Sequence, residues 1–85
     1  MKNIIPQIKK IFSKILRIPS SKITNKLSYV KSDKWDSVNH MTIVSEIEKK
    51  FKIHILMKDV IAMETFGKSI TITNKYLKKK LKIKR

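Results

Sequence analysis

Cysteine is absent from this chain of 85 residues, which excludes a disulfide framework and a thiolate metal site. Its absence fits a reducing compartment, so we expect a cytoplasmic protein. No apolar run approaches the roughly 20 residues of a membrane-spanning helix, and we expect no membrane span. A chain of this length predicts a single domain over residues 1–85 with a small hydrophobic core.

Acidic residues are also scarce. The chain has 6 Asp and Glu against 21 Lys and Arg, a net charge of +15, and no acid precedes Asp33. This balance indicates either a polyanionic partner (nucleic acid or an anionic membrane surface) or compositional drift toward lysine. We favour drift, because Gly, Ala and Arg are scarce while Lys and Ile are abundant. Arginine, which suits phosphate contacts, occurs only at Arg17 and Arg85, so we expect no specific nucleic-acid partner.

Apolar residues near the start of the chain recur at helical spacing and predict an amphipathic helix. Asn3 is placed to cap it, Pro6 is tolerated in its first turn, and Pro19 forces its end. Residues 19–36 show no sustained period and predict a long connection. The apolar positions of the helix are Ile4, Ile5, Ile8, Ile11, Phe12, Ile15 and Leu16. The residues expected to fix the connection to the core are Ile23, Leu27, Tyr29 and Trp35.

A second helix is predicted from Ser37 to Phe51. Val38 falls outside its apolar stripe and should be exposed beside Ser37, whereas His40 lies near the centre of the apolar face. Residues 51–55 alternate apolar and polar side chains, and we interpret them as an extended connection. The apolar stripe of the helix is expected to contain Met41, Ile43, Val44, Ile47 and Phe51.

The last third of the chain predicts a brief helical turn over residues 58–63 and a final helix that begins at Thr65 or Ser69. Residues 70–73 would also suit a strand, which stays open as an alternative. The tail from residue 78 to residue 85 is expected to fray. The apolar positions of the final helix are Phe66, Ile70, Thr73, Leu77 and Leu81.

Patterns of catalytic or metal-binding residues are lacking. His40 and His54 are the only histidines, and no nearby acid or cysteine has the spacing of a co-ligand, so we expect no metal site and a packed His40. No set of nucleophile, base and orienting residue is visible, which predicts a protein without intrinsic catalysis. The methionines expected as core filler are Met41, Met57 and Met63.

Ser37 follows an acid at the start of the predicted second helix. One interpretation is an ordinary N-cap, because serine oxygens often accept hydrogen bonds from first-turn amides. The other is chemical: a phosphate esterified to a serine there would face free amides and the positive end of the helix dipole. Asp36 would then offer a negative group beside the serine to a modifying enzyme.

The tripeptide Asp36-Ser37-Val38 resembles the Asp-Ser-Leu motif of acyl carrier proteins, in which the serine carries 4′-phosphopantetheine. The likeness extends over the whole chain. Residues 35–41 and 46–53 resemble the freestanding branch of that family, where a Trp-Asp-Ser-Leu start and a Leu-Glu-Glu-Glu-Phe end bracket the second helix.

This resemblance implies an all-α bundle of three longer helices and one short helix, with a long loop between the first two. It also implies a monomeric carrier that holds acyl or aminoacyl groups as thioesters on an arm at Ser37. Asp36 and Val38 would take part in partner recognition. The expected partners are a phosphopantetheinyl transferase and the acyl-loading and acyl-transferring enzymes of fatty-acid, lipid or specialised metabolite synthesis.

The chain departs from the family pattern in two respects. Val38 replaces the usual leucine, and the second helix lacks the usual acidic face. From Ser37 to Lys52 the charged residues are Glu46, Glu48, Lys49, Lys50 and Lys52, a net charge of +1. A basic partner surface would be repelled at low salt, so a dedicated pathway is favoured over housekeeping fatty-acid synthesis.

Overall fold

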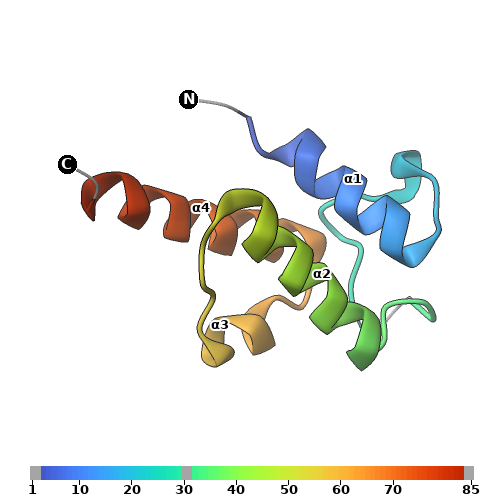
Figure 1. Cartoon of the computed structure of the whole chain (residues 1–85). Coiled ribbons are helices and arrows are strands. Elements are labelled where there is room, and N and C mark those ends of the chain that lie inside the picture. Colours follow the sequence, from blue (N-terminus) through green and yellow to red (C-terminus); the bar gives the residue numbers. More distant parts are fainter. Residues whose placement is uncertain (1–2, 30–31, 84–85) are drawn as a thin grey trace.

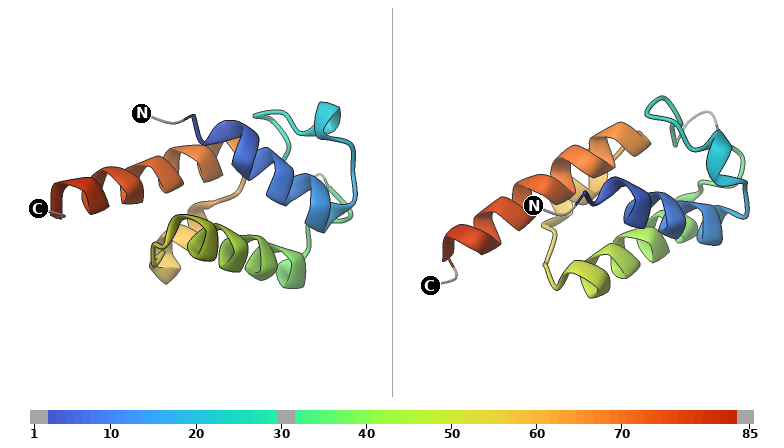
Figure 2. Two further views of the ribbon diagram at one scale, coloured as in Figure 1. Left: turned by 45° about the horizontal axis from the view of Figure 1, so that its top comes forward. Right: turned by 90° about the horizontal axis from the view of Figure 1, so that it is seen from above.

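Four α-helices make up the regular structure of residues 3–29 and 32–83, which the computed structural model describes. The helices are α1 (Ile5–Leu16), α2 (Ser37–Phe51), α3 (Met57–Ala62) and α4 (Phe66–Ile83). In Figure 1, α1 and α2 run in opposite directions, and α4 extends beyond them toward the C-terminus. Figure 2 shows the long connection folded over the end of the bundle where α2 begins. The expected all-α bundle of three longer helices and one short helix, with a long loop before α2, is confirmed.

Three aromatic side chains from distant parts of the chain form the centre of the core. The ring of Phe12 on α1 meets Trp35 and Phe66 edge to face, with centroids 5.0 Å apart in each pair. All three side chains are fully buried. Edge-to-face pairs contribute about 0.5–1.5 kcal/mol beyond the burial of their area. The apolar face of α1 therefore holds both the connection before α2 and the start of α4.

The first helix ends before the chain reaches Pro19. Arg17, the residue after Leu16, takes a left-handed conformation with φ 58°, so a local backbone reversal ends the helix ahead of the proline. At the other end, the N-cap residue is Ile4 and not the predicted Asn3, although Asn3 Oδ1, one residue earlier, accepts a hydrogen bond from the Ile5 amide at 3.0 Å.

The connection between α1 and α2 is fastened to the junction of α3 and α4. Its backbone hydrogen bonds run from Tyr29 N to Glu64 O at 2.9 Å, from Phe66 N to Leu27 O at 2.9 Å, and from Gly67 N to Asn25 O at 3.3 Å. A side chain at Gly67 would press on Asn25, because its Cβ would stand 3.3 Å from the Asn25 backbone oxygen. Among the described residues, the extended pairing is one isolated bridge between Ser28 and Thr65.

Of the residues expected to fix this connection, Ile23 and Trp35 are fully buried and Leu27 packs partly buried against the core. Tyr29 differs, because its side chain remains 39% exposed. A short 3-10 helix, η1 (Ser20–Lys22), also forms in the connection and was not predicted.

The predicted bounds of α2 are confirmed, but one residue of its core stripe is misassigned. Ile43, Val44 and Ile47 are buried, whereas Met41 is 45% exposed. On a helical wheel Met41 stands about 120° from Ile47, outside the face that meets α1. The residues after Phe51 form the expected irregular connection, which leaves the helix through a left-handed Lys52.

Helices α3 and α4 lie close to their predicted positions. Thr65 Oγ1 accepts a hydrogen bond from the Lys68 amide at 3.0 Å, so it caps the first turn of α4. Residues 70–73 are helical, and the alternative of a strand there is wrong. The tail expected to fray from residue 78 is helical as far as Ile83, the last residue of α4, and residues 84–85 lie outside the described part of the chain.

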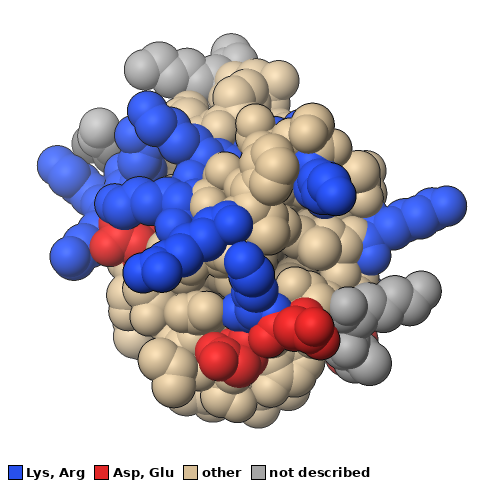
Figure 3. Space-filling view, turned by 90° about the vertical axis from the view of Figure 1, so that its right-hand side faces the viewer, with Lys and Arg blue, Asp and Glu red and all other residues tan. Residues whose placement is uncertain are grey.

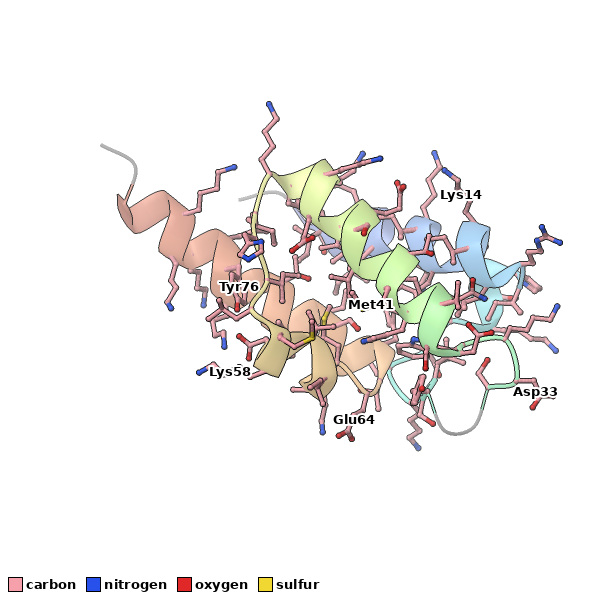
Figure 4. All side chains as sticks on the ribbon, turned by 60° about the horizontal axis from the view of Figure 1, so that its bottom comes forward. Lys14, Asp33, Met41, Lys58, Glu64 and Tyr76 are labelled. Carbon is pink, nitrogen blue, oxygen red and sulfur yellow. The ribbon has the colours of Figure 1, made fainter. Side chains whose placement is uncertain are left out.

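Asp59 fastens α3 to α4. Its Oδ2 accepts hydrogen bonds from the Tyr76 hydroxyl at 2.5 Å and from Lys75 Nζ at 3.1 Å. The hydrogen bonds from Tyr76 and Lys75 hold the pKa of Asp59 below its ordinary value. Burial, together with the bond to Asp59, raises the pKa of Tyr76. Figure 4 shows Tyr76 on α4, on the side that faces α3 and Lys58.

Candidate functional site

Ser37 is the first residue of α2, and it is not the N-cap. The cap is Asp36, whose Oδ1 accepts a hydrogen bond from the Asn39 amide at 2.8 Å. The Asp36 backbone oxygen accepts from the His40 amide at 2.8 Å. The interpretation of Ser37 as an ordinary cap is therefore wrong, since the acid before it occupies that place. The serine hydroxyl is left at an exposed position on the first turn.

Within the part of the chain that the structure describes, the hydroxyl of Ser37 makes a hydrogen-bond contact with a residue of the connection before α2. Tyr29 Oη lies 3.1 Å from Ser37 Oγ, and either atom can be the donor. The Tyr29 ring lies 6.3 Å from the Trp35 ring, edge to face, and 5.9 Å from the His40 ring. The serine is thus flanked by an aromatic cluster.

His40 on α2 links this helix to the connection before it and to α3. Its Nδ1 accepts a hydrogen bond from Trp35 Nε1 at 2.9 Å, and its Nε2 lies 2.8 Å from the backbone oxygen of Val60 on α3. An imidazole that accepts at Nδ1 donates from Nε2, so these partners select the neutral tautomer with the proton on Nε2. The prediction of a packed His40 is confirmed, and its place explains why Trp35 can be buried with its indole N–H satisfied.

An open groove runs along α2 from Ser37. It is lined by Ser37, Val38, Met41, Thr42 and Ser45. Val38 is 74% exposed, which confirms its predicted position. Large apolar side chains on and before α3 are exposed as well: Leu56, Met57 and Ile61.

The expectation that the methionines fill the core holds only for Met63, which is buried. Met57 is 62% exposed, like Met41 on α2, so that expectation is wrong for both. Figure 4 shows Met41 on α2, above the helix that carries Lys58. These exposed methionines belong to the surface that α2 and α3 present together.

A small cavity of about 180 Å³ opens beside the aromatic cluster. It is lined by Tyr29, His40, Ile61, Met63 and Glu64. Tyr29 therefore borders both the serine hydroxyl and this cavity. No group of three or more potential metal ligands (His, Cys, Asp or Glu) occurs among the described residues. Within the same part of the chain, no helix has both the length and the apolar character needed to cross a membrane.

Known proteins resemble this chain over almost its whole length. It is 38% identical over 79 residues to an acyl carrier protein of Buchnera aphidicola subsp. Schizaphis graminum, covering 93% of this chain and 100% of the relative. The acyl carrier protein of Buchnera aphidicola subsp. Acyrthosiphon pisum (strain 5A) is 38% identical over 80 residues, with the same coverage. The chain belongs to the acyl carrier protein family. No family model matches it.

A solved structure shows the same fold. The solution structure of a holo acyl carrier protein from Geobacter metallireducens superposes with a TM-score of 0.81, over 95% of this chain and 93% of that one, at 23% identity. The helices of this chain are therefore arranged as in that acyl carrier protein. The comparisons give no support to the alternative of a lysine-rich protein that binds nucleic acid or anionic membranes.

The charge of this acyl carrier protein is unevenly distributed. All 6 acidic residues lie between Asp33 and Glu64, where they meet only five lysines, and neither flanking segment contains an acid. No residue from Ser37 to Ser45 is charged. Figure 3 shows Lys and Arg side chains gathered over one part of the visible face, above a broad surface with few charges. The positive surplus belongs to α1, the connection after it, and α4.

Sequence reasoning proposed Ser37, Asp36 and Val38 as site residues, and it did not single out other residues that the structure places beside them. Tyr29 was expected to hold the connection in place, and its contact with Ser37 bridges residues that are not neighbours in the sequence. Ile61 sits on a helix too short for a clear apolar period. No sequence signal marked either residue for this place.

Proposed function

We propose that this protein carries acyl or aminoacyl groups on a 4′-phosphopantetheine arm esterified to Ser37 Oγ. The observation that carries the proposal is the separation of two roles at the start of α2. Asp36 caps the helix, so the Ser37 hydroxyl is exposed and available to react. Because Asp36 caps the helix, the Ser37 hydroxyl is not needed for capping. In a chain of this family, this supports the interpretation of Ser37 as the attachment site.

The residues around Ser37 fit a phosphodiester. A serine on the first turn lies near the positive end of the helix dipole, which favours a negative group by about 0.3–1 kcal/mol at an exposed site. Tyr29 adds a hydroxyl within reach of the serine oxygen. When bound, the arm supplies a terminal thiol that holds cargo as a thioester. The exposure of Ser37 leaves the arm free to reach enzymes that dock on the protein.

Partner recognition is assigned to Asp36, Val38 and the uncharged groove of α2. Val38 is the most exposed large apolar side chain described, and it stands next to the attachment site. Apolar burial contributes about 25 cal/mol per Å² removed from water, so this surface can bind without ion pairs. The partners are a phosphopantetheinyl transferase and acyl-loading and acyl-transferring enzymes whose docking surfaces are not strongly basic. Such partners fit a dedicated lipid or specialised metabolite pathway.

The protein itself would catalyse nothing, and its role is to bring one cargo to several enzymes. Tethering replaces a diffusing acyl group by a high local concentration at the docked enzyme. Free thiols on the arm need a reducing environment, which supports a cytoplasmic location. We propose that it works as a monomer, with α1 and α4 turned away from the enzymes that use Ser37.

The test is intact-mass measurement after incubation with coenzyme A and a transferase of broad specificity. Wild type should gain one phosphopantetheine, and Ser37→Ala should gain none. The matched control is Ser45→Ala, which removes another hydroxyl from the same groove and should still gain one arm. A folded wild-type protein that stays unmodified, or a Ser37→Ala protein that is modified, would refute the proposal.

A further inference from the structure

Tyr29 stands out because its hydroxyl contacts the proposed attachment atom and the fold holds it there. Tyr29 Oη is 3.1 Å from Ser37 Oγ. The Tyr29 amide donates to the Glu64 backbone oxygen at 2.9 Å, which ties its backbone to the junction before α4. Its ring contacts Trp35 and His40, so two aromatic neighbours restrict its rotation.

The hydroxyl of Tyr29 is not needed for packing. The side chain is 39% exposed, and its contacts with Trp35 and His40 are made by the ring, which phenylalanine would reproduce. Among the described residues, the hydrogen-bond partner of its oxygen is Ser37 Oγ. The role of the Tyr29 hydroxyl is therefore expected to lie in its hydrogen bond with Ser37.

Esterification of Ser37 would change what this contact can be. An unmodified serine hydroxyl can donate or accept, as can the phenol. An esterified serine oxygen has no proton, so only Tyr29 can donate. The added phosphate also brings charged oxygens next to Ser37 Oγ, and a hydrogen bond to a charged acceptor is about twice as strong as a neutral one.

We propose that Tyr29 is a positioning residue for modified Ser37: its phenol donates a hydrogen bond to the phosphodiester and sets the direction in which the arm leaves α2. This inference rests on the proposed function. Tyr29 also lines the cavity beside His40 and Ile61, so the same side chain touches the start of the arm and the nearest hollow of the protein. An arm held by Tyr29 begins next to that cavity.

The test uses the holo protein, whose arm contains a single phosphorus. The ³¹P resonance is recorded for wild type and Tyr29→Phe, each folded and in denaturant, after intact mass has confirmed one arm per chain. The control is Tyr76→Phe, which removes the hydroxyl of the other tyrosine, the one bonded to Asp59. Circular dichroism checks that all three proteins fold.

We expect the folded wild-type and Tyr76→Phe proteins to share a ³¹P shift that differs from the denatured value. Tyr29→Phe should lose most of that difference and show narrower ³¹P lines, because the phosphate moves more freely. A folded Tyr29→Phe protein with the wild-type shift and linewidth would overturn the role of Tyr29 and leave the carrier function standing. Failure of wild type to accept an arm would overturn both.

Discussion

Replacing His40 with alanine should destabilise the fold strongly, although His40 is only partly buried. The change deletes the acceptor of the Trp35 indole N–H and the donor to the Val60 backbone oxygen. Each lost hydrogen bond costs about 0.5–1.5 kcal/mol, and a buried polar group left without a partner costs about 1–3 kcal/mol. Trp35 is 1% exposed, so water cannot easily replace the lost acceptor. We expect a loss of about 2–4 kcal/mol.

The assay is thermal unfolding followed by the fluorescence of Trp35, the only tryptophan. In a domain of this size 1 kcal/mol shifts the midpoint by about 4–8 °C, so the midpoint should fall by roughly 8–32 °C. His54→Ala is the matched control, because the His54 side chain is 85% exposed. That variant should stay within about 0.5 kcal/mol of wild type, as exposed sites usually do. Equal midpoints for His40→Ala and His54→Ala would refute the reasoning.

Three further predictions follow from the same structure. Val38→Asp should keep the thermal midpoint near wild type and slow priming or cargo transfer at least several-fold. Val44→Asp changes a residue that is 2% exposed and should unfold the domain. If Val38→Asp unfolds the protein, or leaves the transfer rates unchanged, the docking face is misassigned. Because the folded-state pKa of Asp59 is lowered by Tyr76 and Lys75, its contribution is present above the unfolded pKa of about 3.9 and lost as the pH falls through the lower folded value. Denaturant titrations should therefore show that the free energy of unfolding falls less below about pH 4 in Asp59→Asn than in wild type. An equal fall in the two proteins would contradict this. Raising salt should not slow priming by a transferase steeply, since Asp36 is the one charged residue from Trp35 to Ser45 and screening also reduces repulsion between a basic enzyme and this chain. A steep slowing would indicate several ion pairs at the docking surface.

The helices could be predicted because their apolar residues follow a regular period over several turns. The face of α1 that carries Phe12 and the face of α2 that carries Ile47 were assigned correctly, except that Ile5 on α1 is 42% exposed and Met41 on α2 is 45% exposed. Met41 was misassigned because its position on the wheel lies just outside the stripe, where apolar character alone suggests the core. Its exposure beside the proposed attachment site fits the proposed docking surface, which also presents apolar side chains.

Contacts between distant residues could not be predicted in the same way. Asp59 meets Tyr76 across two helices, and Tyr29 meets Ser37 across a connection with no regular period. Such contacts depend on how the connection folds back onto the start of α4, which the apolar pattern does not encode. Ser37 was proposed from the residues beside it, and the structure adds that Asp36 caps α2.

The most direct measurement of the central claim is the position of the arm along the chain. Trypsin should release residues 35–49 as one peptide, because lysines occupy positions 34 and 49. That peptide holds three hydroxyl side chains, Ser37, Thr42 and Ser45, so fragmentation of the primed peptide can tell them apart. We predict that every fragment carrying phosphopantetheine contains Ser37, and that fragments holding only Thr42 and Ser45 are unmodified. An arm on either of those two residues, or on any other peptide, would contradict the account.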